Sequence, residues 1–276
     1  MRASEKVQAL TQHALAFGRR WSPRKALSSQ VGEGVDYPRD IADLIVFHKL
    51  HSSLPAEMAL KGYLALKDVF VDWNEVRISS VREIQEALKF CPGSLELAVF
   101  LKDTFELLHR ERQDVSLEFL SEQNLGEIRQ FLKRLRGLDA STIEVLLKVR
   151  KDYPVFPISP AIEAVLVRLG IARKADGRAK SERLLHEAVD PARALLLHHF
   201  LLDHSLTTCP PSEELVDCPH CGIRQMCAFF QRNGRRHPRR STTERARAAR
   251  RQSRPSRTSA RKAAKSGARA ARARRA

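Results

Sequence analysis

Apolar residues recur every three or four positions along most of the chain between residues 37 and 170. This spacing places them on one face of an α-helix, so the stretch is predicted to be helical almost throughout. The spacing is clearest in two groups of positions: Ile41, Leu44, Ile45 and His48, and further on Val81, Ile84, Ala87 and Leu88.

The same pattern predicts helices outside and within this stretch, over residues 5–18, 95–110, 116–120, 125–135, 176–189 and 192–204. Ser159 and Pro160 are typical of the N-cap and first residue of another helix. Residues 69–80 are expected to form a link between helices. The chain is therefore predicted to have an all-α fold.

The charge of the chain is concentrated at its C-terminal end. The 276-residue chain has a formal net charge of +17, and residues 232–276 contain 18 Lys and Arg against one acid, Glu244. This tail is rich in Arg, Ala and Ser and has no aromatic residue, so it is predicted to be disordered. Such a tail binds nucleic acid by neutralising phosphates, without sequence preference and with strong salt dependence.

No apolar run approaches the roughly 20 residues that span a bilayer, and the N-terminus lacks the apolar core of a signal peptide. These features predict a protein of the cytoplasm, where thiols stay reduced. With its basic tail, the protein is expected to associate with the nucleoid, as a monomer.

Four of the five cysteines lie within nineteen residues: Cys209, Cys218, Cys221 and Cys227. In a reducing compartment, thiols at this density predict ligands of one soft metal centre rather than disulfides. Four thiolates suit either a tetrahedral zinc ion or an iron–sulfur cluster. The long, unequal arms on either side of the Cys218–Cys221 pair favour the cluster, and zinc stays the alternative.

The cysteine pattern, with His198, His199, Phe200 and His204 ahead of Cys209, resembles the C-terminal [4Fe-4S] module of endonuclease III-type DNA glycosylases. These proteins belong to the helix-hairpin-helix superfamily. The first cysteine loop departs from the family, with eight residues in place of six. The resemblance implies a two-lobed helical fold, an iron–sulfur lobe, a link to base-excision repair and binding to double-stranded DNA.

A turn at Gly137 between two predicted helices forms a candidate helix-hairpin-helix. Such a turn presents backbone N–H groups to a DNA phosphate and grips it without reading sequence. Lys133, Arg134 and Arg136 are expected beside that phosphate. Asp139 stands where the family normally has its second glycine, and its charge is expected to repel a phosphate.

The resemblance also implies two catalytic positions, a Lys whose amine attacks the sugar and an Asp that stabilises the cationic sugar. These positions fall on Ser141 and Ser159, so neither residue type is retained. Without the amine, no Schiff base forms by that route, and a hydroxyl offers little to a developing positive charge. Glu163, four residues beyond Ser159, is the possible substitute carboxylate.

The sequence therefore leads to three functional hypotheses. The first is a DNA-binding, endonuclease III-like protein with reduced or lost glycosylase and lyase activity. The others are an active monofunctional glycosylase that uses Glu163 and a zinc-binding nucleic-acid adaptor. The expected organisation has four parts: an N-terminal helix and connector (1–36) that packs with the cluster lobe, a helical domain with the hairpin (37–170), the iron–sulfur lobe (171–231) and the tail (232–276).

Overall fold

The structure is a computed structural model that describes residues 1–20, 29, 30, 36, 37, 40–151 and 156–233. Most of these residues are helical, which confirms the predicted all-α class. The predicted tail, apart from its first two residues, and the basic positions Arg24 and Lys25 lie outside the described residues. The helix α12, Ala228–Asn233, includes those first two tail residues.

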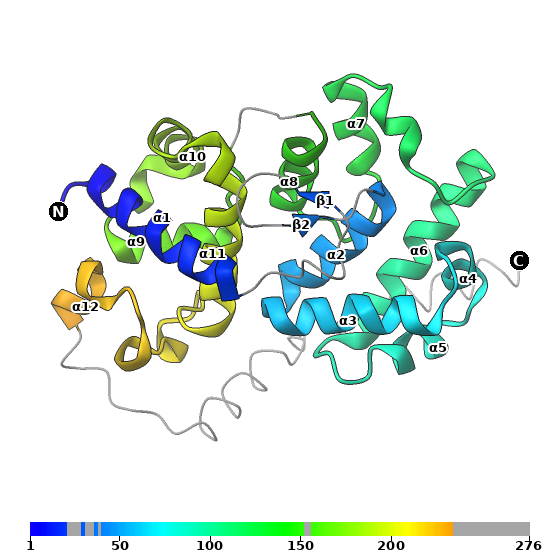
Figure 1. Cartoon of the computed structure of the whole chain (residues 1–276), viewed down its shortest axis with the longest axis horizontal. Helices are drawn as coiled ribbons and strands as arrows, with labels where there is room; N and C mark the ends of the chain where they lie inside the picture. The colour runs from blue at the N-terminus through cyan, green and yellow to red at the C-terminus, as the bar shows by residue number, and fades with distance from the viewer. Residues whose placement is uncertain (21–28, 31–35, 38–39, 152–155, 234–276) are drawn as a thin grey trace, which may run out of the picture.

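One group of helices contains α2 to α8 (Figure 1). Their bounds are α2 Ile41–Ser53, α3 Ala56–Val69, α4 Trp73–Ile78, α5 Val81–Ala87, α6 Ser94–Arg112, α7 Leu125–Leu132 and α8 Ala140–Lys151, with a 3₁₀ turn, η1, at Glu118–Ser121. α2 packs on α3 and α8, and α6 packs on α4 and α5. These helices form the right-hand lobe in Figure 1.

The second group gathers around α11 (Figure 1). It contains α1 Ala3–Arg20, α9 Pro160–Leu169, α10 Gly177–Ala188, α11 Ala194–Thr207 and α12, with short 3₁₀ turns η2 Lys174–Asp176, η3 Pro191–Arg193, η4 Glu213–Leu215, η5 Cys218–His220 and η6 Arg224–Met226. α1 packs along α11, and α9 packs on both α11 and α12. The first helix therefore packs with the last helices among the described residues.

Two details differ from the sequence predictions. The expected link over 69–80 contains the helix α4, because the Asp72 carboxylate caps it by accepting from the backbone N–H of Glu75 at 2.7 Å. Trp73 of this helix stacks on Phe105 with ring centroids 5.3 Å apart. In the connector, the two-residue strands β1 Ser29–Gln30 and β2 Asp36–Tyr37 pair antiparallel.

The two groups of helices meet where α11 contacts α2. α11 is apolar around most of its circumference, with ten of its fourteen residues buried, as a helix surrounded by others requires. α2 is similarly enclosed. This contact places the hairpin between α7 and α8 on one side of α2 and the cysteine loops at the far end of α11.

No helix in the described part of the chain is both long and apolar enough to cross a bilayer.

Candidate metal centre and DNA-binding hairpin

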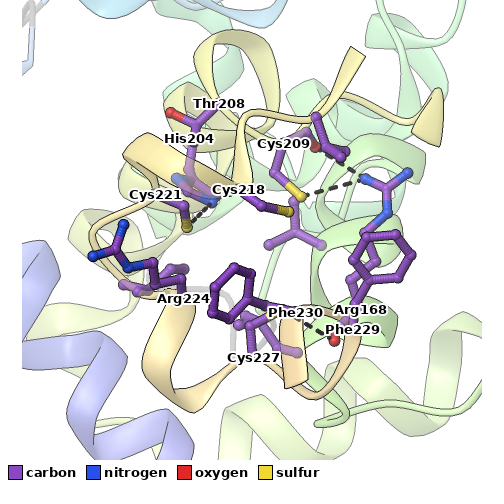
Figure 2. Close-up of a pocket in the computed structure, with 14 residues that line it drawn as sticks. Arg168, His204, Thr208, Cys209, Cys218, Cys221, Arg224, Cys227, Phe229 and Phe230 are labelled. Carbon is purple, nitrogen blue, oxygen red and sulfur yellow. Dashed lines mark hydrogen bonds between the residues drawn. The ribbon is translucent and has the colours of Figure 1, made fainter. Parts of the chain in front are cut away.

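The four cysteines line a single cavity at the C-terminal end of α11 (Figure 2). Cys209 follows that helix, and its backbone N–H donates to the carbonyl oxygen of His204 at 2.8 Å. Cys218 opens η5, and Cys221 and Cys227 directly follow the two 3₁₀ turns η5 and η6. Short, tight turns thus point sulfur atoms from three chain segments into one space. The donor set fits a centre bound by four thiolates.

Arg168 of α9 holds the long first cysteine loop in place. Its guanidinium donates to the Cys209 sulfur at 3.3 Å and to the carbonyl oxygens of Pro210 at 2.6 Å and Pro211 at 2.5 Å. The side chain is buried, so these bonds also satisfy a cation that has little access to water. The eight-residue loop is therefore shaped by one buried arginine.

The cavity is electrically unfavourable for uncompensated thiolates. Burial raises the pKa of Cys209 and Cys218, and it raises the pKa of Cys221 to about 12. The nearby Arg168 guanidinium opposes this effect at Cys209. A metal cation deprotonates its thiol ligands and compensates their charge. The residues present therefore suit thiols or metal-bound thiolates, and four thiolates are a ligand set that both zinc and an iron–sulfur cluster accept.

His204 is the last residue of the predicted His-rich lead-in to the cysteines. Its Nε2 lies 3.8 Å from the Cys221 sulfur (Figure 2). His198 and His199 lie more than one turn earlier on α11 and are fully buried. The histidines ahead of Cys209 therefore lie in two places. His204 lies at the cysteine cavity, and His198 and His199 lie at the contact between the two groups of helices.

The predicted hairpin joins α7 to α8 through a turn at Gly137. This glycine has φ +93°, and a Cβ there would approach the Phe100 ring to 3.0 Å, so both backbone and space require glycine. The Gly137 carbonyl accepts from Lys49 Nζ at 2.6 Å. The hairpin is thus anchored on α2 and α6.

Asp139 caps α8 with its own carboxylate. Oδ1 accepts from the backbone N–H of Thr142 at 3.0 Å, Oδ2 accepts from the Thr142 hydroxyl at 2.8 Å, and the Ser141 hydroxyl also donates to Oδ1. Burial alone would raise the pKa of Asp139, but these hydrogen bonds outweigh it and hold the pKa below its ordinary value. An internal anion therefore lies at the helix N-terminus that a phosphate would approach.

The cations predicted to contact DNA differ in their surroundings. Lys133 and Arg136 are exposed. Arg134 forms a two-pronged ion pair with Glu111, at 3.1 and 2.7 Å, and its guanidinium stacks on the Phe131 ring. Arg134 and Arg136 both line a surface groove beside α6.

The two serines that the resemblance places at catalytic positions both take part in capping a helix. Ser141 is buried and bonded to Asp139. Ser159 caps α9, and its hydroxyl oxygen accepts from the backbone N–H of Ile162 at 3.2 Å. Glu163 is half-buried on α9, one turn beyond Ser159. The structure thus gives both serines a structural role in starting a helix.

Two features of this region were missed from the sequence. Lys49 is half-buried beside the hairpin, and burial lowers its pKa while the Asp139 carboxylate opposes that effect. The second feature is a set of buried histidines on α2 and α11. The spacing of His48 and His51 by three residues on one predicted helix was the available signal, but it does not show which distant helix faces them.

No protein-family model matches the chain. Endonuclease III of Sulfolobus acidocaldarius is 22% identical over 160 residues, which cover 58% of this chain and 68% of that protein. The transcriptional activator DEMETER of Arabidopsis thaliana is 28% identical over 100 residues, which cover 36% of this chain. The matched stretch is 5% of the length of DEMETER, so the chain corresponds to a small part of that relative.

Solved structures match the chain over nearly all of their own length. A non-covalent endonuclease III–DNA complex superimposes with a TM-score of 0.57 at 14% identity, over 86% of this chain and 100% of that one. A thermostable thymine-DNA glycosylase superimposes with a TM-score of 0.54 at 14% identity, over 83% and 98%. The fold inferred from the sequence is thereby confirmed: the chain has the all-α fold of these endonuclease III and thymine-DNA glycosylase structures, and its sequence is similar to that of endonuclease III.

Proposed function

We propose that the protein binds double-stranded DNA in base-excision repair, with glycosylase and AP-lyase activity reduced or lost. Its four cysteines would hold a [4Fe-4S] cluster, which supplies a rigid metal–sulfur core that joins the loops at 209–227 to α9 and α11. Lys133, Arg136 and the hairpin at Gly137 would contact the DNA backbone, with the basic tail adding sequence-independent affinity. Association with the nucleoid follows from this role.

The observation that carries this proposal is the structural role of the two serines at the positions that the resemblance assigns to catalysis. The Ser141 hydroxyl is bound to Asp139, and Ser159 is occupied in capping α9. Neither position offers an amine to form a Schiff base or a carboxylate to stabilise a positive sugar. The surrounding fold stays intact. A protein with this fold and these substitutions is suited to hold DNA rather than to cut the glycosidic bond.

A single-turnover assay tests the loss of activity. The full-length protein, purified without oxygen, is incubated with duplexes that carry oxidised bases, mismatched adenine, uracil or an abasic site, with and without alkali. We expect salt-dependent binding and no base release. Release that Glu163→Gln abolishes and Ser141→Ala leaves unchanged would instead establish a glycosylase with a relocated carboxylate.

The metal content separates this proposal from a zinc-binding adaptor. Iron and acid-labile sulfide in the same amounts, with broad visible absorption, are expected for a cluster. Zinc in place of iron at the cysteines would support the adaptor. The variant Cys218→Ser should lose whichever metal the cysteines hold.

One observation favours a second function, an AP lyase with a relocated amine. Lys49 Nζ lies beside Gly137, and burial lowers the pKa of Lys49 against the opposing effect of Asp139, which shifts the lysine toward a neutral, nucleophilic amine. Such an amine could condense with the C1′ aldehyde of an abasic site, with loss of water, to form an imine.

Borohydride trapping on an abasic duplex tests this second function, because the reagent reduces the imine to a stable covalent adduct. A lyase would give an adduct that Lys49→Gln abolishes. Lys61→Gln is the matched control, since Lys61 likewise lies over a phenylalanine ring, 4.6 Å from the Phe90 centroid against 5.1 Å from Lys49 to Phe100. No adduct with the wild-type protein would exclude the lyase.

A further inference from the structure

Four histidines meet where α2 contacts α11, away from the cysteine cavity. His48 and His51 come from α2, and His198 and His199 come from α11. All four side chains are fully buried. The ring centroids of His48, His198 and His199 are 5.2 to 5.7 Å apart in every pairing. A buried group of imidazoles this dense requires a physical explanation, because each ring carries two polar nitrogen atoms.

The hydrogen bonds leave specific nitrogen atoms of this group unused. His198 Nδ1 lies 2.9 Å from the carbonyl oxygen of Pro157, so Nδ1 carries the proton and donates it. Its Nε2 then holds a lone pair, and that atom is buried without a hydrogen-bond partner. Both ring nitrogens of His48 are likewise buried and without a partner among the described residues. Leaving such buried polar atoms without a partner destabilises the folded protein.

The third ring, His199, is held by a histidine of α2. His199 Nδ1 lies 2.8 Å from His51 Nδ1, and the two rings stack with centroids 4.7 Å apart. One ligand atom from each of His48, His198 and His199 lies within 4.8 Å of the others. A histidine whose second nitrogen is held by a carbonyl or another polar group is the usual arrangement of a metal ligand.

We propose that His48, His198 and His199 bind a divalent transition-metal ion, with Zn²⁺ the best match. Three neutral imidazoles suit zinc, which takes nitrogen ligands in tetrahedral geometry. Zinc–nitrogen bonds of about 2.0–2.1 Å place tetrahedral ligand atoms about 3.4 Å apart. The rings therefore need to approach by at most about 1.4 Å, which small side-chain rotations provide.

The electrostatics of the site agree with a bound cation. Burial lowers the pKa of His48 to about 3 and of His198 to about 4, which keeps both rings neutral and their lone pairs available at physiological pH. The Asp139 carboxylate acts to raise the pKa of both histidines, so its negative charge favours a positive charge at this place. An ion here would be attracted by Asp139 and coordinated by the imidazoles.

The proposed ion has a structural role. It would join α2 to α11 and, through the His198–Pro157 hydrogen bond, the segment ahead of Ser159. The ion would thus fix the contact between the two groups of helices beneath the hairpin. Full burial of the three ligands leaves no path for substrate, so the site is distinct in role from a catalytic zinc centre with an open position.

Zinc binding to the full-length protein tests the proposal. Wild type, His48→Leu and His186→Leu are each saturated with zinc sulfate, desalted and analysed for zinc per chain by mass spectrometry. His186 is exposed on α10 and serves as the control. We expect His48→Leu to retain one equivalent less than the other two proteins, whatever metal the cysteines hold. Equal zinc in all three would overturn the proposal.

The stability of His48→Leu is a second test, because the expected change differs in sign with and without a bound ion. With no ion, replacing an unpartnered imidazole by an apolar side chain should leave the zinc-treated protein as stable or more stable. With the ion, the variant should melt at a lower temperature than zinc-treated wild type. Should His48→Leu fail to fold, crystals of the zinc-treated wild-type protein decide the matter. Anomalous density at the zinc edge between the three rings supports the site, and its absence there refutes it.

Discussion

The Asp139 carboxylate accepts from the backbone N–H of Thr142 at 3.0 Å and so occupies the N-terminus of α8. In a helix-hairpin-helix, that N-terminus is where a DNA phosphate finds unpaired N–H groups and the positive end of the helix dipole. The chain thus supplies its own anion at the point of the proposed phosphate contact. The carboxylate that would repel a phosphate also stabilises the helix, so the hairpin keeps its shape while the proposed phosphate contact is weakened.

Replacing Asp139 by glycine should strengthen DNA binding. Removal of the carboxylate frees the helix N-terminus, and an anion there is worth about two- to fivefold in affinity. The measurement is the dissociation constant for an undamaged duplex across a salt series. Asp72→Gly is the matched control, because Asp72 caps α4 in the same way. An equal gain in both variants would point to a general charge effect rather than to the hairpin.

The three cations near the hairpin should contribute unequally. Lys133→Ala and Arg136→Ala should each lower the salt slope of DNA binding by about one unit, the amount expected for one lost phosphate contact. Arg134→Ala should have a smaller effect, since its guanidinium is already neutralised by Glu111. The slopes come from titrations at several salt concentrations. A larger loss at Arg134 than at Arg136 would contradict this ranking.

Replacing Arg168 by methionine should weaken metal retention at the cysteines. The change keeps the apolar stem but removes the bonds to Cys209, Pro210 and Pro211. Loss of such a supporting contact typically costs about ten- to a hundredfold in metal affinity. Metal content after dialysis against a chelator measures this loss. Arg183→Met, at an exposed residue on α10 away from the cysteine cavity, should behave like wild type.

Truncation after Gln231 should reduce nonspecific DNA affinity and flatten its salt dependence. The removed segment contains 18 Lys and Arg, and each neutralised phosphate adds about 0.9 to the slope for duplex DNA. Binding of the truncated and full-length proteins is compared on one duplex. An unchanged slope would show that the folded part of the chain carries the DNA contacts.

The predicted boundary between the helical domain and the iron–sulfur lobe, at residue 170, stays a prediction. The packing of α9 on α11 and α12 favours an earlier division, between α8 and α9. Sequence periodicity could not show this, because it reports that α9 has an apolar face and not which helix covers that face.

The sequence by itself determined the helical class, because apolar spacing and caps such as Ser159 act within a few residues. It also determined the candidate ligand set of four cysteines, whose spacing is a local property of the chain. The grouping of His48 with His198 and His199, the insertion of Arg168 among the cysteine loops and the position of Lys49 at Gly137 were decided only by the tertiary structure. Each joins residues between 41 and 151 positions apart, and only the packing of α2, α9 and α11 brings them into contact.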